Sequence, residues 1–383
     1  MRSNLTRTIW MLSLVSLFTD MASEMLYPVM PLYLKQIGFT IVVIGVLEGV
    51  AEAVAGLSKS YFGSLSDRSG KRLPFVQAGY ALSAISKPMM ALFTSIGWIF
   101  SARTIDRLGK GLRTGARDAM LSAEATKETK AEVFGFHRSM DTLGAVIGPA
   151  LALTWLYYNP GEYKLLFLFA FLPGLVAIAF TLLLKEKNIP STGKKTVSLF
   201  EGFRYWKHAS PEYRKVAGGL LLFALFNSSD VLLFLKMKDS GHDDATIIGV
   251  YIFYNLVYAL LAFPMGKLAD KIGIRKIFLT GLLFFAVTYT GFAFSGSTIA
   301  FVLLFVCYGM YAACTEGVSK AWITNMVSEK EAATAIGTYT GFQSIAALIA
   351  SSLAGLIWYQ FGPAAAFLSS AVVSLLVIAW FRR

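Results

Sequence analysis

The sequence predicts an all-α polytopic membrane protein in which twelve transmembrane helices form two pseudo-symmetric six-helix bundles. Composition is the first reason: 56% of the 383 residues are hydrophobic and only 15% are charged. A soluble domain of this size does not bury so much apolar surface. The second reason is that the apolar segments run for about 20 residues or more, the length that crosses a hydrocarbon core of ~30 Å. The third is a charged turn that occurs once in each half of the chain.

The apolar segments follow one another with short connections. We place the spans at about 9–34, 42–66, 73–93, 96–118, 133–157, 164–184, 216–238, 246–267, 277–295, 298–322, 333–358 and 363–381. The only long polar connection, 185–215, divides the chain into a first bundle, 1–184, and a second bundle, 216–383. Within this linker, Glu201–His208 have the pattern of an amphipathic helix that lies along a membrane surface.

Lysine and arginine gather in alternate connections, and this bias sets the expected orientation. One side holds both charged turns, the loop 113–132, the linker and the C-terminal Arg382 and Arg383. This side is predicted to be cytoplasmic, with both termini inside, in a cytoplasmic (inner) membrane of the bacterial type. The net charge of +12 then reflects loop charge that faces membrane lipid and water, so no nucleic-acid partner is expected.

The charged turn reads GSLSDRSGKR at residues 63–72 and returns as GKLADKIGIRK at residues 266–276. Each copy follows one long apolar segment and precedes another. A repeat of about half the chain length indicates two similar helical bundles packed as one unit, an arrangement typical of secondary transporters.

On these residues the chain resembles the major facilitator superfamily over essentially its whole length. The two turns match the pattern that this family has between its second and third helices and between its eighth and ninth. Arg103, followed by Gly109 and Gly111, is similar to the family's fourth-helix arginine motif, although Asp106 and Arg107 replace the usual glutamine and glycine.

Two further segments resemble exporters of this family. Gly144, Gly148 and Pro149 are similar to the fifth-helix motif of exporters, with Ala152 where a glycine pair is expected. In the first helix, Asp20 and the segment 28–32 (PVMPL) resemble the start of drug–proton antiporters.

The resemblance implies that the repeated turn is a gate, formed by Gly63, Asp67, Arg68, Lys71 and Arg72. Asp67 would bind the start of the eleventh helix at about 333–337, because a carboxylate is stabilised at a helix N-terminus. The three cations of this turn would pair with Asp118, and Asp270 and Arg275 would form a weaker version in the second half. The alternative interpretation is a tight turn with topology-setting charge.

Ionisable residues inside the predicted spans are the candidates for the transport pathway, since each costs at least ~2.5–3.5 kcal/mol at the bilayer centre and needs a partner or water. Helical spacing places several of them on common faces. Lys87 stands alone in the third span. The pathway candidates are Asp20, Glu24, Tyr27, Glu48, Glu52, Arg103, Asp106, Arg107, Lys110, Arg138, Asp141, Asp230 and Glu316.

Two interpretations of these charges stay open. They can neutralise one another and hold helices together, as the stripe of Arg103, Asp106, Arg107 and Lys110 would by pairing with Glu48, Glu52 or Asp141. Alternatively, a carboxylate in a low-dielectric cavity can load and release a proton, for which Asp20, Glu24, Glu48 and Glu52 are the best candidates. The positive stripe of Arg103, Arg107 and Lys110 would also suit an anionic solute.

The sequence therefore favours a proton-coupled secondary active transporter that exports an amphipathic drug-like compound or metabolite by alternating access. The alternatives are a transporter of an anionic solute, such as an organic acid or a siderophore-like chelate, and a membrane receptor or scaffold that does not transport. No nucleophile–base pair or metal-ligand cluster indicates an enzyme, a cofactor or a metal site. The expected partners are a small-molecule substrate and protons, and we expect a monomer.

Overall fold

The computed structural model describes residues 5–27, 29–186, 197–198 and 200–382, and this part of the chain contains helices and no strand. It divides into two compact units. Unit 1 comprises residues 1–126, 140–208 and 327–341, and unit 2 comprises residues 127–139, 209–326 and 342–383. The predicted bundles 1–184 and 216–383 follow the chain order, whereas helices α6 (Lys130–Tyr158) and α14 (Ala332–Phe361) each contribute to both units.

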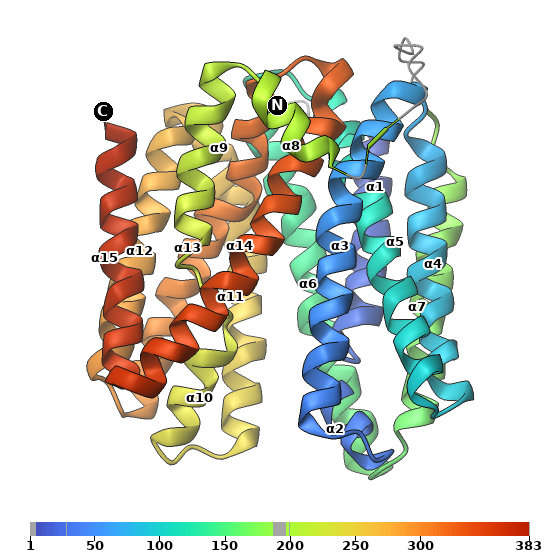
Figure 1. Ribbon diagram of the computed structural model, residues 1–383, viewed down its shortest axis with the longest axis vertical. Helices are drawn as coiled ribbons and strands as arrows, with labels where there is room; N and C mark the ends of the chain where they lie inside the picture. Colours follow the sequence, from blue (N-terminus) through green and yellow to red (C-terminus); the bar gives the residue numbers. More distant parts are fainter. Residues whose placement is uncertain (1–4, 28, 187–196, 199, 383) are drawn as a thin grey trace. The chain divides into compact units, whose positions relative to one another are not determined.

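Unit 1 is a helical bundle whose members run roughly side by side (Figure 1). In it α5 packs against α3 and α4, and α7 packs against α1 and α4. A buried apolar cluster that includes Tyr33, Ile99 and Phe167 fills one end of the bundle. The bounds are α1 Arg7–Glu24, α2 Met30–Gln36, α3 Ile41–Ser69, α4 Leu73–Leu92, α5 Ile96–Ala123, α7 Tyr163–Leu182, α8 Glu201–His208 and the 3-10 turn η1 Glu329–Glu331.

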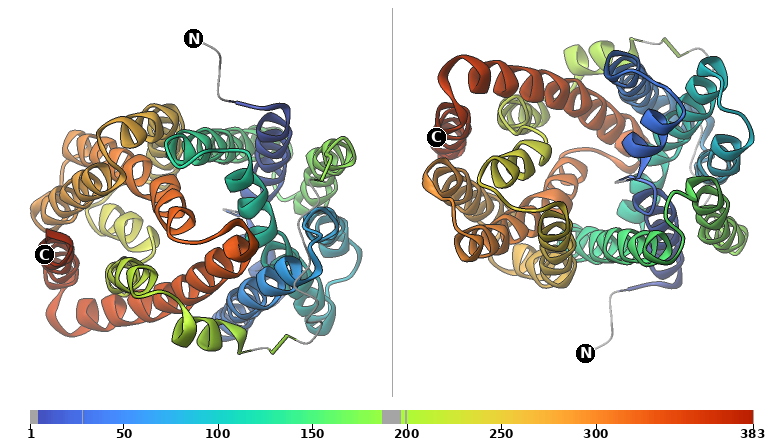
Figure 2. Two further views of the ribbon diagram at one scale, coloured as in Figure 1. Left: turned by 90° about the horizontal axis from the view of Figure 1, so that it is seen from above. Right: turned by 90° about the horizontal axis from the view of Figure 1, so that it is seen from below.

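Unit 2 is also a bundle, and Figure 2 shows the helices of each unit nearly end-on. In unit 2 α13 packs against α11 and α12, and α15 packs against α9 and α12. Its core is aromatic: Phe285 stacks on Tyr289 with ring centroids 4.0 Å apart, and Phe234 stacks on Phe305 at 5.6 Å. The bounds are α9 Pro211–Ala224, α10 Val231–Asp239, α11 Asp244–Ile272, α12 Ile274–Phe294, α13 Thr298–Asn325 and α15 Pro363–Arg382.

The helical class and the order of the predicted spans are confirmed. Among the described residues, seven helices are long and apolar enough to cross a membrane by length and composition. The predicted spans outside this set correspond to α1 with α2, to α3, α4 and α5, and to α9 with α10. Charges or breaks interrupt most of these helices, so that they fall short of the other seven in length or in apolar composition.

Two spans that the sequence predicts as continuous are broken. The segment 9–34 is divided between α1 and α2, and the segment 216–238 is divided between α9 and α10. Position 28, which lies outside the described residues, is a proline in the sequence, and proline cannot donate a helical N–H. The second break contains Asn227, Ser229 and Asp230, whose side chains compete with the backbone for hydrogen bonds. The two breaks lie at corresponding positions of the two halves of the chain.

The predicted amphipathic helix of the linker is confirmed as α8, Glu201–His208. Within unit 1 Glu201 forms an ion pair with Arg68 at the end of α3, and Tyr205 is hydrogen-bonded to Glu331. Burial and the neighbouring Glu331 raise the pKa of Tyr205, so its hydroxyl stays protonated and donates. The linker residues 187–196 and 199 lie outside the described residues, and the position of α8 on a membrane surface stays a prediction.

Small residues allow close backbone approach between α3 and the first turns of α14 in unit 1. A Cβ built on Gly63 would overlap the carbonyl oxygen of Ala333, and one built on Gly337 would overlap the carbonyl oxygen of Lys59. Gly135 of α6 and Gly266 of α11 repeat this arrangement in unit 2, where a Cβ on Gly266 would overlap the carbonyl oxygen of Ala131.

We expect Gly63→Ala to destabilise the protein by about 1–3 kcal/mol, because the methyl group forces two packed backbones apart. Gly49→Ala is the matched control on the same helix, since no atom lies within 4 Å of a Cβ at Gly49. Thermal unfolding of both purified variants in detergent measures the difference. Equal unfolding temperatures for the two variants would contradict close packing at Gly63.

Candidate functional site

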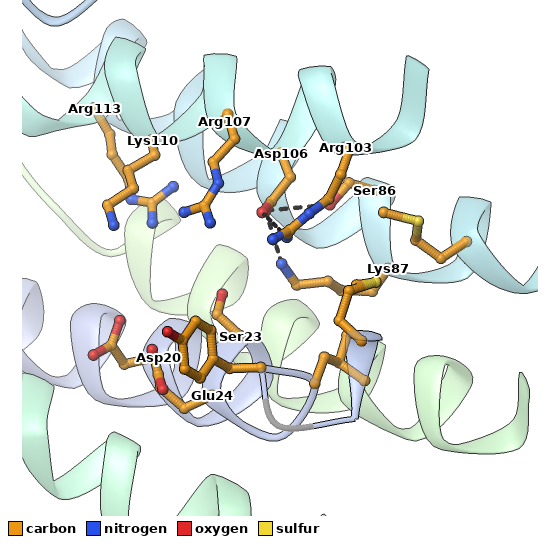
Figure 3. Close-up of a pocket in the computed structure, with 14 residues that line it drawn as sticks. Asp20, Ser23, Glu24, Ser86, Lys87, Arg103, Asp106, Arg107, Lys110 and Arg113 are labelled. Carbon is orange, nitrogen blue, oxygen red and sulfur yellow. Dashed lines mark hydrogen bonds and ion pairs between the residues drawn. The ribbon is translucent and has the colours of Figure 1, made fainter. Parts of the chain in front are cut away.

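A polar cavity of about 70 Å³ lies inside unit 1 (Figure 3). Helix α1 and the break after it supply one wall, and α4 and α5 supply the opposite wall. The volume accommodates a small polar group rather than a whole drug-sized molecule, whose sites are typically ~300–1,000 Å³. The lining residues are Asp20, Ser23, Glu24, Leu26, Tyr27, Met30, Ser86, Lys87, Met90, Arg103, Asp106, Arg107, Lys110 and Arg113.

The cationic wall is one face of α5. Arg103, Arg107, Lys110 and Arg113 recur at helical spacing and point toward the cavity, while Asp20 and Glu24 on α1 lie across from them (Figure 3). The predicted stripes on the first and fourth helices therefore line the same cavity. Carboxylates on one wall and cations on the other create a strong field across a small space.

Asp106 is the centre of a buried ion-pair cluster. Its Oδ1 lies 2.7 Å from the Nζ of Lys87, and its Oδ2 lies 3.5 Å from Nη1 of Arg103. Ser86 donates a further hydrogen bond of 3.3 Å to the same carboxylate. The sequence interpretation of Lys87 as an isolated charge is wrong, because the neighbouring helix α5 brings Asp106 against it. This cluster connects α4 to α5, and the carboxylate of Asp106 neutralises the positive charge of Lys87.

Arg103 and Arg107 are paired with the acids of α3. Arg103 binds Glu48 through two parallel hydrogen bonds of 2.8 Å, and Arg107 lies 3.3 Å from Glu52. Glu48 and Glu52 are half-exposed and lie outside the set of residues that line the cavity. For Arg103 and Arg107, the interpretation of intramolecular pairing is therefore confirmed. Asp141, the third partner that the sequence suggested, instead accepts a hydrogen bond from Ser16.

Arg113 is a lining residue that sequence reasoning assigned to a cytoplasmic loop. The structure corrects this, because α5 continues to Ala123 and Arg113 is 93% buried within it, with 7% of its surface exposed. The signal was present in the sequence, since Arg113 continues the i, i+3, i+7, i+10 spacing of Arg103, Asp106 and Lys110. Ser23 and Ser86 were also missed, and short hydroxyl side chains give no comparable signal.

Three predicted pathway residues belong to unit 2 and are not among the residues that line this cavity. Arg138 forms an ion pair of 3.1 Å with Glu316 and donates a hydrogen bond of 2.6 Å to the hydroxyl of Tyr258. Asp230, at the break between α9 and α10, accepts a hydrogen bond from Tyr308. Unit 2 thus contains two sets of polar contacts, one of Arg138 with Glu316 and Tyr258 and one of Asp230 with Tyr308.

The predicted partner of Asp67 is confirmed. Its Oδ2 accepts hydrogen bonds from the backbone N–H of Thr334 at 2.7 Å and from the Thr334 hydroxyl at 2.9 Å, at the first turn of α14. Its Oδ1 lies 2.8 Å from Nη2 of Arg72, which is 1% exposed. Arg72 also donates to the carbonyl oxygens of Ala119 and Glu329. A carboxylate thus caps a helix N-terminus and neutralises a buried guanidinium.

The second aspartate repeats this geometry in unit 2. Asp270 accepts hydrogen bonds from the backbone N–H groups of Ala131 at 3.0 Å and Glu132 at 2.6 Å, at the first turn of α6. The other predicted gate residues have different surroundings. Asp118 is paired with Arg117 at 2.8 Å, and the ion pairs that the structure shows for Arg68 and Arg72 are with Glu201 and Asp67. Lys71 and Arg275 are exposed.

The model of the Major Facilitator Superfamily matches residues 12–253 and 216–383 of this chain. The chain belongs to this superfamily. An MFS-type transporter of Methanocaldococcus jannaschii is 31% identical over 97% of this chain and 93% of its own length. The multi-drug resistance efflux pump PmrA of Streptococcus pneumoniae is 22% identical over 76% of this chain and 74% of its own length.

A solved structure of the same fold agrees with this membership. The human organic anion transporter MFSD10 (TETRAN) superposes with a TM-score of 0.82 over 98% of both chains, at 16% sequence identity. The resemblance inferred from the repeated turn is therefore confirmed. As a member of the major facilitator superfamily, the chain is a multi-pass membrane transporter and not an enzyme.

Proposed function

We propose that this chain is a proton-coupled secondary active transporter that moves an amphipathic solute by alternating access. The supporting observation is the cavity of unit 1, where Asp20 and Glu24 face the cationic wall of α5. A carboxylate beside a solute site can exchange a proton when the solute changes the local charge. Binding of the solute and protonation of Asp20 or Glu24 therefore affect each other through the electrostatic field of the cavity.

The contacts of Asp67 and Asp270 support the alternating-access part of the proposal. Each aspartate binds the N-terminus of a helix, α14 or α6, that contributes residues to both units. We propose that these two contacts break and re-form during the transport cycle. The transport pathway is then closed near the two aspartates in one state and open there in another. The repeated turn then acts as a gate rather than as a simple loop.

Export is the direction we propose, in line with the efflux activity named for the relative of Streptococcus pneumoniae. An inner-membrane location with both termini in the cytoplasm fits this direction. The second candidate is transport of an anionic solute, which the cationic wall of α5 favours. Both candidates use the same cavity, but an anion binds best when Asp20 or Glu24 is protonated, so it would move together with protons rather than in exchange for them.

Everted membrane vesicles test this proposal. An imposed proton gradient should drive flux of a fluorescent amphipathic probe, either cationic ethidium or anionic fluorescein, and a protonophore should abolish this flux. Vesicles with a variant in which both Asp20 and Glu24 are changed to their amides are expected to lose gradient-driven uptake. Flux of neither probe, or flux that ignores the gradient, would refute proton-coupled transport.

A further inference from the structure

Arg113 differs from the other cations of the cavity in its partners. Its Nη1 donates a hydrogen bond of 2.6 Å to the hydroxyl of Ser83, and its guanidinium lies 4.7 Å from the ring centroid of Tyr80. Its Nε is buried without a hydrogen-bond partner. Within the described part of the chain, no carboxylate forms an ion pair with Arg113. The contacts that the structure shows for this guanidinium, which is 93% removed from water, are therefore with a neutral hydroxyl and an aromatic face.

Lys110 lies one turn before Arg113 on the same face of α5 (Figure 3). It is close enough to Glu52 to interact with it electrostatically, yet it forms no ion pair within the residues that the structure describes. By contrast, Lys87, Arg103 and Arg107 all have carboxylate partners. Among the described residues, the two lining cations without an ion pair, Lys110 and Arg113, are thus neighbours on α5.

A buried charge without a counter-ion costs several kcal/mol of folding free energy, because its hydration is lost and not replaced. An anion that enters the cavity would restore the missing interaction. The planar guanidinium offers paired N–H donors that match a carboxylate or a phosphate, and a nearby ammonium adds a second charge. The apolar lining residues Leu26, Met30 and Met90 complete a site with a polar end and an apolar surface.

We propose that Arg113 and Lys110 form the anion-binding subsite of this transporter, and that its solute is an organic anion whose carboxylate or phosphate docks there. This inference rests on the proposed function, since it assigns the substrate class of the same cavity. The cavity volume of about 70 Å³ fits such a charged group. Arg103, Arg107 and Lys87 keep the wall in place through their ion pairs.

The test measures binding of 2-naphthoate to the purified full-length protein by calorimetry, with neutral 2-naphthylmethanol as the matched probe. Arg113→Gln should weaken naphthoate binding about ten- to a hundredfold, the range of a lost charge-assisted hydrogen bond. Lys110→Gln should weaken it by a smaller factor. Arg214→Gln, which changes an exposed cation of α9 that does not line the cavity, should bind like the wild type. Equal affinities of Arg113→Gln and wild type for naphthoate would overturn the proposal.

Thermal unfolding without ligand separates a binding role from a structural one. Removing an uncompensated buried charge should leave the unfolding temperature of Arg113→Gln unchanged or higher, whereas a structural arginine would lower it. Naphthoate should raise the unfolding temperature of the wild type and leave that of Arg113→Gln unchanged. An unfolding temperature of Arg113→Gln well below that of the wild type, with naphthoate binding retained, would assign a structural role.

The anion can be a free solute or the headgroup of a lipid. Nanodiscs of phosphatidylcholine alone and of phosphatidylcholine with phosphatidylglycerol distinguish these sources, since an anionic headgroup in the site would compete with naphthoate. Proton-driven transport of ethidium, together with equal naphthoate affinities of Arg113→Gln and the wild type, would overturn the anion subsite while leaving proton-coupled transport intact. Naphthoate binding that depends on Arg113, without any proton-driven flux, would support the anion subsite and refute proton-coupled transport.

Discussion

Asp106→Ala is expected to destabilise the protein by about 3–5 kcal/mol, the cost of removing one partner of a buried ion pair. Asp106 is 8% exposed and is the carboxylate that binds Lys87, whose exposed fraction is 5%. Without it the ammonium of Lys87 stays buried beside Arg103 with no counter-ion. Thermal unfolding in detergent measures the loss of stability. It is monitored by the reaction of a thiol label with Cys314, which is buried in the folded protein.

Two variants test the cause of this effect. The double variant Asp106→Leu with Lys87→Met removes both charges and should be more stable than either single variant, because apolar groups of similar size replace a buried pair at little cost. Asp239→Ala is the matched control, since Asp239 is exposed at the end of α10. A surface change of this kind is typically within ~0.5 kcal/mol of neutral. A double variant as unstable as Asp106→Ala would mean that side-chain shape, not charge, matters here.

Asp67→Asn is expected to have a comparable effect on stability and to abolish transport. The substitution keeps the size of the side chain but leaves Arg72 buried without its carboxylate, a loss of about 3–5 kcal/mol. It also weakens the charge-assisted hydrogen bonds to Thr334. Unfolding temperature and proton-driven probe uptake in vesicles measure the two consequences.

The two copies of the turn provide an internal control for this prediction. Asp270 caps α6 through backbone N–H groups only, and no cation forms an ion pair with it in the ranges that the structure describes. Asp270→Asn should therefore cost less, about 1–3 kcal/mol. If Asp67→Asn and Asp270→Asn were equally destabilised, the buried Arg72 would not be the source of the larger effect.

Much of the fold follows from local sequence patterns. Runs of apolar residues about 20 long place the spans, and the repeated turn predicts that Asp67 meets the start of α14, where the structure shows Thr334. The amphipathic pattern of Glu201–His208 predicts α8 with the same bounds. These predictions succeed because periodicity, helix length and helix polarity are local or symmetric properties.

The missed features depend on contacts between distant segments. The partner of Lys87 lies on the next helix, so helical spacing within the third span could not show it. Arg113 was interpreted as loop charge because the positive-inside rule counts cations near span ends without regard to burial. The breaks in the first and seventh spans were missed because a run of apolar residues does not report where polar side chains or a proline stop a helix.

The central claim is that solute charge and proton occupancy are linked inside the cavity of unit 1. A bound anion and the carboxylates of Asp20 and Glu24 repel each other, so binding is most favourable when a carboxylate is protonated. Adding 2-naphthoate to the purified protein in weakly buffered detergent with a pH indicator should therefore take up protons. A variant with both acids changed to amides should bind naphthoate without proton uptake. Equal proton uptake by this variant and by the wild type would contradict the account.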